Sequence, residues 1–157
     1  MTKIISNDEF IAKRLHKEID SYLKTEAIKI VDEKDQLSID HHFDHMGFPR
    51  RVEEIHWEIV PNSEHYMVKI PTRMEESRDF TVRIIEKYNL RGPVILYGDY
   101  FLMENYRMDT SFLPTALWDF IGVPICLYAV SLEQNWCFSF HSSRHLNFGY
   151  APNSLPE

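Results

Sequence analysis

The sequence is poor in cysteine and glycine, with only two cysteines and five glycines among 157 residues. Two cysteines cannot make the disulfide framework of a small secreted protein. No glycines have the GxGxxG or GxxxxGK[ST] spacing of phosphate-binding loops, so we expect no common ATP- or dinucleotide-dependent enzyme. No run of about 18 uncharged apolar residues could span a membrane, and no secretory signal is predicted. We therefore expect a cytoplasmic protein with reduced thiols.

Positive charge is also scarce, because 17 Lys and Arg residues stand against 24 Asp and Glu residues, a net charge of −7. This balance argues against nucleic acid or an anionic membrane as the main partner. A hydrophobic content of 44% and this length suit one domain that needs no metal or disulfide to fold. We predict a single domain over residues 1–150, followed by a short flexible tail over residues 151–157.

The spacing of apolar residues predicts an α+β fold. Helical spacing, each time after an S/T-x-x-E capping box, predicts helices over residues 6–24 and 72–88, and a shorter helix is expected over 115–121. Alternation predicts hairpins over residues 55–70 and 125–141. Further strands are expected at 27–31, 36–40, 94–103 and 146–150, and residues 41–51 are expected to be irregular. The prediction is an antiparallel or mixed sheet of about five to seven strands with two main helices packed on it.

The hairpin over residues 125–141 has a predictable register. If Ser131 faces Trp136 across the turn, then Cys126 faces His141, and Cys137 faces Val130. The two cysteines are then too far apart for a disulfide. One face carries the apolar side chains and must lie in the core, while the two cysteines and His141 share the other face.

The most conspicuous potential metal ligands lie in the segment Asp40-His41-His42-Phe43-Asp44-His45. Imidazole and carboxylate are the usual zinc ligands, and a turn could place His42, Asp44 and His45 around one ion. Asp40-His41-His42 resembles the Asp-His-His signature of a manganese-dependent phosphoesterase family, although the D-x-D of that family's first strand is missing here. The whole segment also resembles the H-x-H-x-D-H signature of metallo-β-lactamase-like hydrolases, with Asp40 at the first histidine position.

Both resemblances cover six residues, and both families have larger proteins. A solvated loop is the simpler interpretation, so we predict no metal and no cofactor. The alternative is a small metal-dependent hydrolase that uses His41, His42, Asp44 and His45.

Two other groups of residues could carry chemistry. Cys126 opposite His141 could form a thiolate–imidazole pair. His141 and His145 flank Arg144, a combination that could cleave RNA by acid–base catalysis while the arginine holds the phosphate. Core packing and a polar turn are the simpler explanations, so no catalytic residue is predicted and we expect no enzyme.

Acidic residues gather in several short clusters, which are either a solvated surface or contacts to a basic partner. The candidate contact residues are Glu53, Glu54, Glu58, Asp99, Glu104 and Asp109. In general character, being small, acidic and aromatic-rich, the chain resembles bacterial immunity proteins, which neutralise a cognate toxin, often a basic nuclease, by covering its active site. The resemblance implies a binding protein whose partner is a basic toxin domain, with no nucleic-acid or membrane partner. A regulatory or structural subunit of a larger assembly is a third interpretation.

Overall fold

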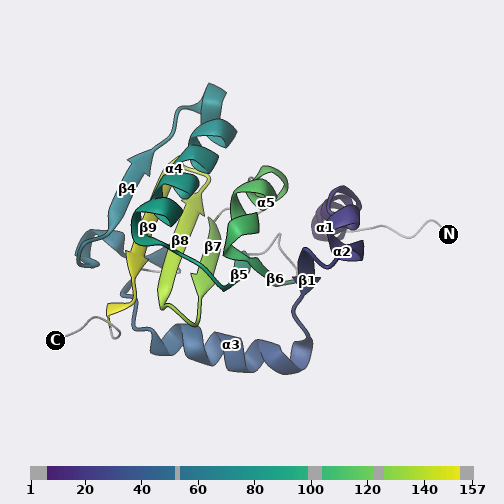
Figure 1. Ribbon diagram of the computed structural model, residues 1–157, viewed down its shortest axis with the longest axis horizontal. Helices are drawn as coiled ribbons and strands as arrows, with labels where there is room; N and C mark the ends of the chain where they lie inside the picture. Colours follow the sequence, from purple (N-terminus) through teal and green to yellow (C-terminus); the bar gives the residue numbers. More distant parts are fainter. Residues whose placement is uncertain (1–6, 52–53, 99–103, 122–125, 153–157) are drawn as a thin grey trace.

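A single antiparallel sheet of seven strands forms the centre of the molecule (Figure 1). The computed structural model describes residues 7–51, 54–98, 104–121 and 126–152. The strand order is β1-β6-β5-β7-β8-β9-β4, and every neighbouring pair is antiparallel. The predicted α+β class is confirmed, with the strand number at the upper end of the predicted range.

The strands of this sheet are β1 (Ile28–Ile30), β4 (Glu64–Met67), β5 (Pro93–Gly98), β6 (Tyr106–Asp109), β7 (Cys126–Ser131), β8 (Trp136–His141) and β9 (His145–Tyr150). A separate pair of short strands consists of β2 (Arg50–Arg51) and β3 (Glu54–Ile55). The α-helices are α1 (Asn7–Glu18), α2 (Asp20–Lys24), α3 (Glu33–His45), α4 (Arg73–Tyr88) and α5 (Leu113–Phe120). The 3-10 helices are η1 (Trp57–Ile59), η2 (Ile70–Thr72) and η3 (Thr110–Phe112).

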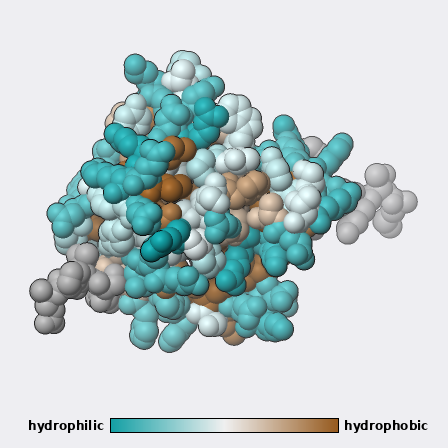
Figure 2. All heavy atoms as spheres, viewed as in Figure 1, coloured by the Kyte–Doolittle hydropathy of each residue, from teal (hydrophilic) through white to brown (hydrophobic). Residues whose placement is uncertain are grey.

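One face of the sheet is covered by α1, α4 and α5, which lie side by side in Figure 1. The helices bury an apolar stripe each, including Ile19 after α1, Phe80 and Ile84 on α4, and Leu117 and Phe120 on α5. Figure 2 shows that the side of the molecule formed by these helices is largely hydrophilic, with a few separate hydrophobic areas. This amphipathic pattern is the reason the sequence predicted α4 and the α1–α2 segment correctly.

The opposite face of the sheet is covered by α3 and the segment that follows it. Phe43 of α3, together with Met46 and Phe48, packs on a second buried cluster that includes Val130 and Cys137. The predictions of a strand at 36–40 and of an irregular segment at 41–51 are therefore wrong for residues 36–45, which belong to α3. The sheet lies between two layers of helix.

The sequence hid α3 because only Phe43 is buried among its 13 residues. A helix that rests on its neighbour through one side chain gives little apolar periodicity. Its end charges were the usable signal, since Glu33 and Asp35 lie in the first turn and His42 and His45 in the last, where the helix dipole favours them.

The predicted hairpin over residues 55–70 does not form. Ile55 ends β3, and residues 57–59 form the 3-10 helix η1. β4 pairs instead with β9, so that His65 lies opposite Asn147. Strand pairing between residues so far apart in the chain cannot be read from local alternation. The notion that the strand at 146–150 ends the sheet is also excluded, because β9 lies inside the sheet with β4 beyond it.

The hairpin over residues 125–141 has the predicted register. Cys126 lies opposite His141, Cys137 opposite Val130, and Ser131 opposite Trp136. Both cysteines are buried thiols. Residue 125 lies outside the described residues, and the remaining members of the predicted core face are all buried in the main core.

Several element ends differ from the predictions. The capping box expected between Thr72 and Glu75 is replaced by a contact one residue further on, where the Thr72 hydroxyl donates to Glu76. The predicted end of α4 at Tyr88 is correct, and Asn89, which follows it, adopts a left-handed conformation with φ 52°. Ala151, predicted in the tail, is buried, and its N–H donates to the carbonyl of Asn135. Residues 99–103 of the predicted strand at 94–103, and Ser6 of the first capping box, lie outside the described residues.

Within the described part of the chain, no helix is both long and apolar enough to cross a membrane.

A hydrogen-bonded carboxylate ties β4 to α4 and makes stability depend on pH. Glu64 accepts hydrogen bonds from Lys87 at 2.8 Å and from the Tyr88 hydroxyl at 2.9 Å. The bond from Lys87 is the main cause that lowers the pKa of Glu64, against an opposing effect of burial. Since the folded state favours the ionised form, this contribution is fully present above the unfolded pKa and is lost as pH falls through the folded pKa.

We expect Glu64→Gln to lower the melting temperature at pH 7 and the difference from the unchanged protein to disappear near pH 3. Calorimetric melts across this pH range measure the effect. Glu86→Gln, at an exposed position on α4, is the control. Its difference in melting temperature from the unchanged protein should not shrink in the same way as the pH falls. A difference for Glu64→Gln that persists at pH 3 would contradict the assignment.

Candidate functional site

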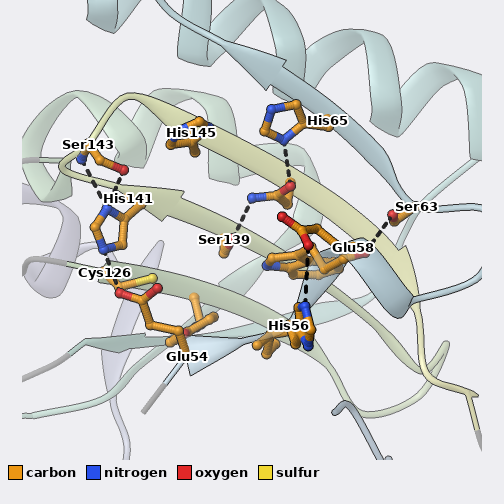
Figure 3. A pocket seen from close by; sticks show the side chains of 14 residues that line it. Glu54, His56, Glu58, Ser63, His65, Cys126, Ser139, His141, Ser143 and His145 are labelled. Carbon is orange, nitrogen blue, oxygen red and sulfur yellow. Dashed lines mark hydrogen bonds and ion pairs between the residues drawn. The ribbon is translucent and has the colours of Figure 1, made fainter. Parts of the chain in front are cut away.

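A cavity of about 620 Å³ opens on the face of the sheet that α3 leaves partly uncovered. Its floor is formed by residues of β7, β8, β9 and β4, and its wall by the segment from Glu54 to Glu58. Figure 3 shows side chains from both parts pointing into the same space. We call this cavity the histidine pocket, because His56, His65, His141 and His145 all line it.

The sheet register brings the floor residues together. Ser139 lies opposite Tyr128 on one side and Asn147 on the other, and Asn147 in turn lies opposite His65. Side chains at directly opposed positions point to the same face. Apolar neighbours such as Leu146 point to the other face and into the main core. Polar residues therefore occupy one end of a face whose other end, around Val130, is apolar.

The wall of the pocket rests on a glycine of β9. A Cβ atom at Gly149 would lie 3.0 Å from a ring carbon of Trp57 and 3.1 Å from Cγ1 of Val60. These separations are shorter than ordinary van der Waals contact. Gly149 thus allows the chain around η1 to lie directly on the sheet, which places Glu54 and Glu58 at the pocket.

We expect Gly149→Ala to reduce the free energy of unfolding by about 1–3 kcal/mol, because overpacking forces Trp57 or Val60 to move. Urea denaturation followed by Trp fluorescence measures the loss. Ala129→Gly removes a methyl group from the opposite face of the sheet. Its loss of stability comes from a cavity and is compared with the loss that the clash at Gly149→Ala causes. A loss below about 0.5 kcal/mol for Gly149→Ala would show that the wall is not in tight contact with β9.

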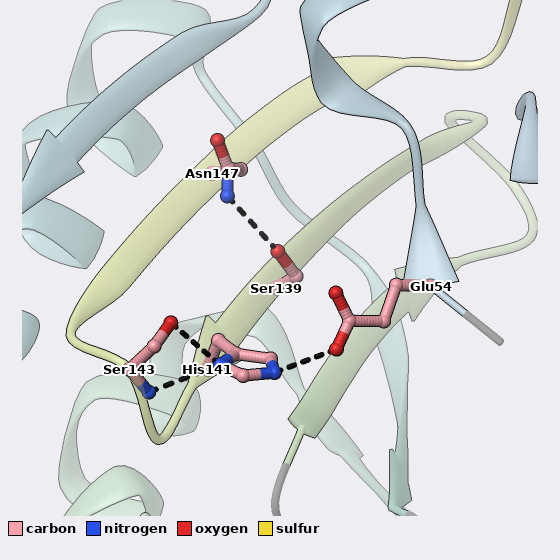
Figure 4. Close-up of polar contacts among 5 residues, drawn as sticks. All are labelled: Glu54, Ser139, His141, Ser143 and Asn147. Atoms are coloured by element: carbon pink, nitrogen blue, oxygen red, sulfur yellow. Dashed lines mark hydrogen bonds and ion pairs between the residues drawn. The ribbon is translucent and has the colours of Figure 1, made fainter. Parts of the chain in front are cut away.

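A chain of hydrogen bonds orients the ring of His141 (Figure 4). Its Nε2 lies 2.6 Å from Oε1 of Glu54, and its Nδ1 accepts a hydrogen bond of 3.0 Å from the backbone N–H of Ser143. A carboxylate only accepts and a backbone N–H only donates, so the neutral ring carries its proton on Nε2. The Ser143 hydroxyl lies 2.7 Å from the same Nδ1. The contacts therefore fix the β8–β9 turn and the direction of the Glu54 carboxylate.

A second group of contacts organises the other end of the floor. Nδ1 of His65 lies 2.8 Å from Oδ1 of Asn147, whose amide nitrogen faces the Ser139 hydroxyl at 3.4 Å. His65 therefore donates through Nδ1, and Nε2 of the neutral ring is an acceptor. The rings of His65 and His145 are stacked, with their centroids 5.2 Å apart.

The permanent charges of the histidine pocket are negative. Glu54 and Glu58 belong to the wall, and none of the described lining residues is a lysine or an arginine. Glu58 lies 3.4 Å from Nε2 of His56 and its side chain is 82% exposed. A phosphate in this space would meet two carboxylates, so the arrangement does not suit the RNA cleavage considered for His141 and His145. Arg144, the third member of that combination, does not line the pocket.

Cys126 and His141 lie at the predicted strand positions, but the contacts of His141 differ from those of a thiolate–imidazole pair. His141 directs one nitrogen to Glu54 and the other to Ser143, so neither is directed at the thiol. Cys126 lies beside the Tyr128 hydroxyl at the pocket floor, where burial is the main cause that raises the pKa of Tyr128. The geometry therefore does not give Cys126 the imidazole base that a thiolate–imidazole pair requires.

The histidines of the alternative metal site lie on α3. His41, His42 and His45 line a separate, smaller cavity with Ser38 and Asn135, and the rings of His41 and His45 are 5.1 Å apart. Asp44 belongs to the same exposed part of the helix. Among the described residues, no group of three or more His, Cys, Asp or Glu side chains is arranged to hold a metal ion. The structure thus adds no support to the hydrolase alternative.

The four predicted contact residues that the structure describes lie in two separate places. Glu54 and Glu58 come together at the histidine pocket. Glu104 pairs with His16 at 2.8 Å, and Asp109 accepts a hydrogen bond from the N–H of Ser111. These two residues lie at or near β6, which β5 separates from β7, the nearest strand of the pocket floor. Glu53 and Asp99 lie outside the described residues.

Sequence reasoning missed His56, His65, Ser139 and Asn147 as site residues. The available signal was the alternation within strands, since Ser139 and His141 of β8, like His145 and Asn147 of β9, occupy the positions between core residues. A polar run on one face of a sheet indicates either solvent or a site. The pairing of β4 with β9, which adds His65, was needed to show that these residues line a cavity.

Comparison with known proteins gives no relative, since no protein-family model matches the chain and no curated protein matches it.

Proposed function

We propose that this chain is a binding protein of the immunity type, which neutralises a basic toxin domain by direct contact. The observation that carries the proposal is the histidine pocket, a polar cavity whose permanent charges are the carboxylates of Glu54 and Glu58. The net charge of −7 supports the same conclusion, because it attracts a basic partner over a distance. Tyr128, Trp57 and the stacked histidines add the flat surfaces that anchor protein interfaces.

The proposal involves no catalysis, metal or cofactor on the part of this chain. Nucleic acid and anionic membranes are not its partners, because the pocket and the whole chain repel a polyanion. We place the protein in the cytoplasm, and the buried thiols of Cys126 and Cys137 suit that reducing compartment.

Co-expression with the neighbouring gene of the source genome tests the proposal. We expect the neighbour to encode a protein that is toxic alone and harmless together with this chain. The purified complex should weaken strongly between about 50 and 500 mM salt, because screening removes the attraction between opposite charges. A harmless neighbour, together with no basic protein recovered from lysate at low salt, would contradict the proposal.

A further inference from the structure

The hydrogen-bonding groups of the histidine pocket define what kind of side chain can enter it. Oε1 of Glu54 is held by His141, which leaves the second carboxylate oxygen as an acceptor in a fixed direction. Nε2 of His65 is an acceptor, since the Nδ1 proton of that ring is used by Asn147. Glu58 adds a second carboxylate. These three groups are acceptors and two of them are carboxylates, so a complementary group carries positive charge and several N–H bonds.

The shape of the pocket separates the two basic side chains. A cavity of about 620 Å³ is much larger than an ammonium group, and flat rings such as Trp57 and the stacked pair of His65 and His145 border it. A guanidinium is planar, weakly hydrated, able to bind a carboxylate through two parallel N–H groups and able to stack on aromatic rings. A lysine ammonium is a strongly hydrated point charge that gains less from these surfaces.

We infer that the histidine pocket is a receptor for an arginine side chain of the basic partner, with Glu54 as the main carboxylate contact. This inference rests on the proposed function, which identifies the protein that supplies the arginine. The hydrogen bond from His141 positions Glu54 before the ligand arrives, so little side-chain freedom is lost on binding.

Three small probes test the chemistry without the partner. Nα-acetyl-arginine amide is titrated into the full-length ¹⁵N-labelled protein, next to the lysine amide and the citrulline amide, the last being nearly isosteric with arginine but uncharged. The chain has three tryptophans, which gives a built-in control. Trp57 borders the pocket, whereas Trp118 is exposed on α5, on the other side of the sheet.

We expect the arginine amide to shift the indole N–H resonance of Trp57 saturably, with a dissociation constant in the millimolar range. The citrulline amide should bind at least about ten-fold more weakly, because it lacks the charge that strengthens hydrogen bonds to a carboxylate, and the lysine amide should fall between them. Glu54→Gln keeps an acceptor for His141 and should weaken arginine binding by at least about ten-fold. Glu75→Gln, an exposed glutamate on α4, is the matched control and should leave binding unchanged.

Equal affinity for arginine and citrulline, equal shifts of Trp57 and Trp118, or unchanged binding by the Glu54→Gln variant would each overturn the inference. The partner complex separates this failure from failure of the proposed function. If no probe binds while a salt-sensitive toxin complex forms, the pocket assignment is wrong and the function stands. If the arginine probe binds as expected but no basic partner exists, the pocket assignment stands and the immunity function is wrong.

Discussion

Replacing Phe138 by alanine should lower the free energy of unfolding by about 3–5 kcal/mol, the range typical of a buried phenylalanine. Phe138 is completely buried at the centre of β8. Its ring lies 4.9 Å from that of Phe148, 5.5 Å from Trp136 and 6.2 Å from Phe80 of α4. The variant leaves a cavity where two strands and a helix meet. Because domains are stable by only about 5–15 kcal/mol, the loss is a large part of the total.

Chemical denaturation and calorimetry measure this effect, and the melting temperature should fall by about 10 °C. Phe138→Leu fills most of the space and should lose about 1.5 kcal/mol or less, which keeps the test informative if the alanine variant does not fold. Trp118→Ala on the exposed side of α5 is the control and should change stability by about 0.5 kcal/mol at most. Similar losses for Phe138→Ala and Trp118→Ala would show that β8 is not the centre of the core.

The second large effect concerns the partner. We expect the double variant Glu54→Gln with Glu58→Gln to weaken the complex with the basic toxin domain by about 100-fold, since both permanent charges of the histidine pocket are removed. Asp109→Asn removes another of the predicted contact charges, at the end of β6, which β5 separates from the pocket strand β7. It should change the affinity by no more than about three-fold, because a distant exposed charge is screened.

Surface plasmon resonance at constant ionic strength measures both affinities, and circular dichroism verifies that the variants are folded. Most of the change for the double variant should appear in the dissociation rate, as is usual for groups at the centre of an interface. An equal or larger effect of Asp109→Asn would place the interface near β6 and remove the histidine pocket from the contact surface.

Local sequence patterns determined those parts of the fold that are stabilised within one segment. Helical spacing with a full apolar stripe located α4, and strict alternation on both sides of a short turn located the β7–β8 hairpin in its correct register. In that hairpin each residue is close to its partner in the chain, so the positions of Cys126 and His141 followed from counting. The charge balance likewise needs no structure, because it depends on composition alone.

The tertiary structure alone decided where the site lies. α3 was hidden because it contacts the sheet through Phe43 and leaves nearly all its other residues in solvent, and the His41–His45 segment therefore resembled a loop. β4 finds its partner in β9, far along the chain, and that pairing brings His65 beside Asn147. Gly149 then allows η1, which contains Glu58, and the preceding strand β3, which contains Glu54, to lie against the same strands. The histidine pocket is assembled from four strands and the segment from Glu54 to Glu58 by strand pairing and close packing, which no local period in the sequence encodes.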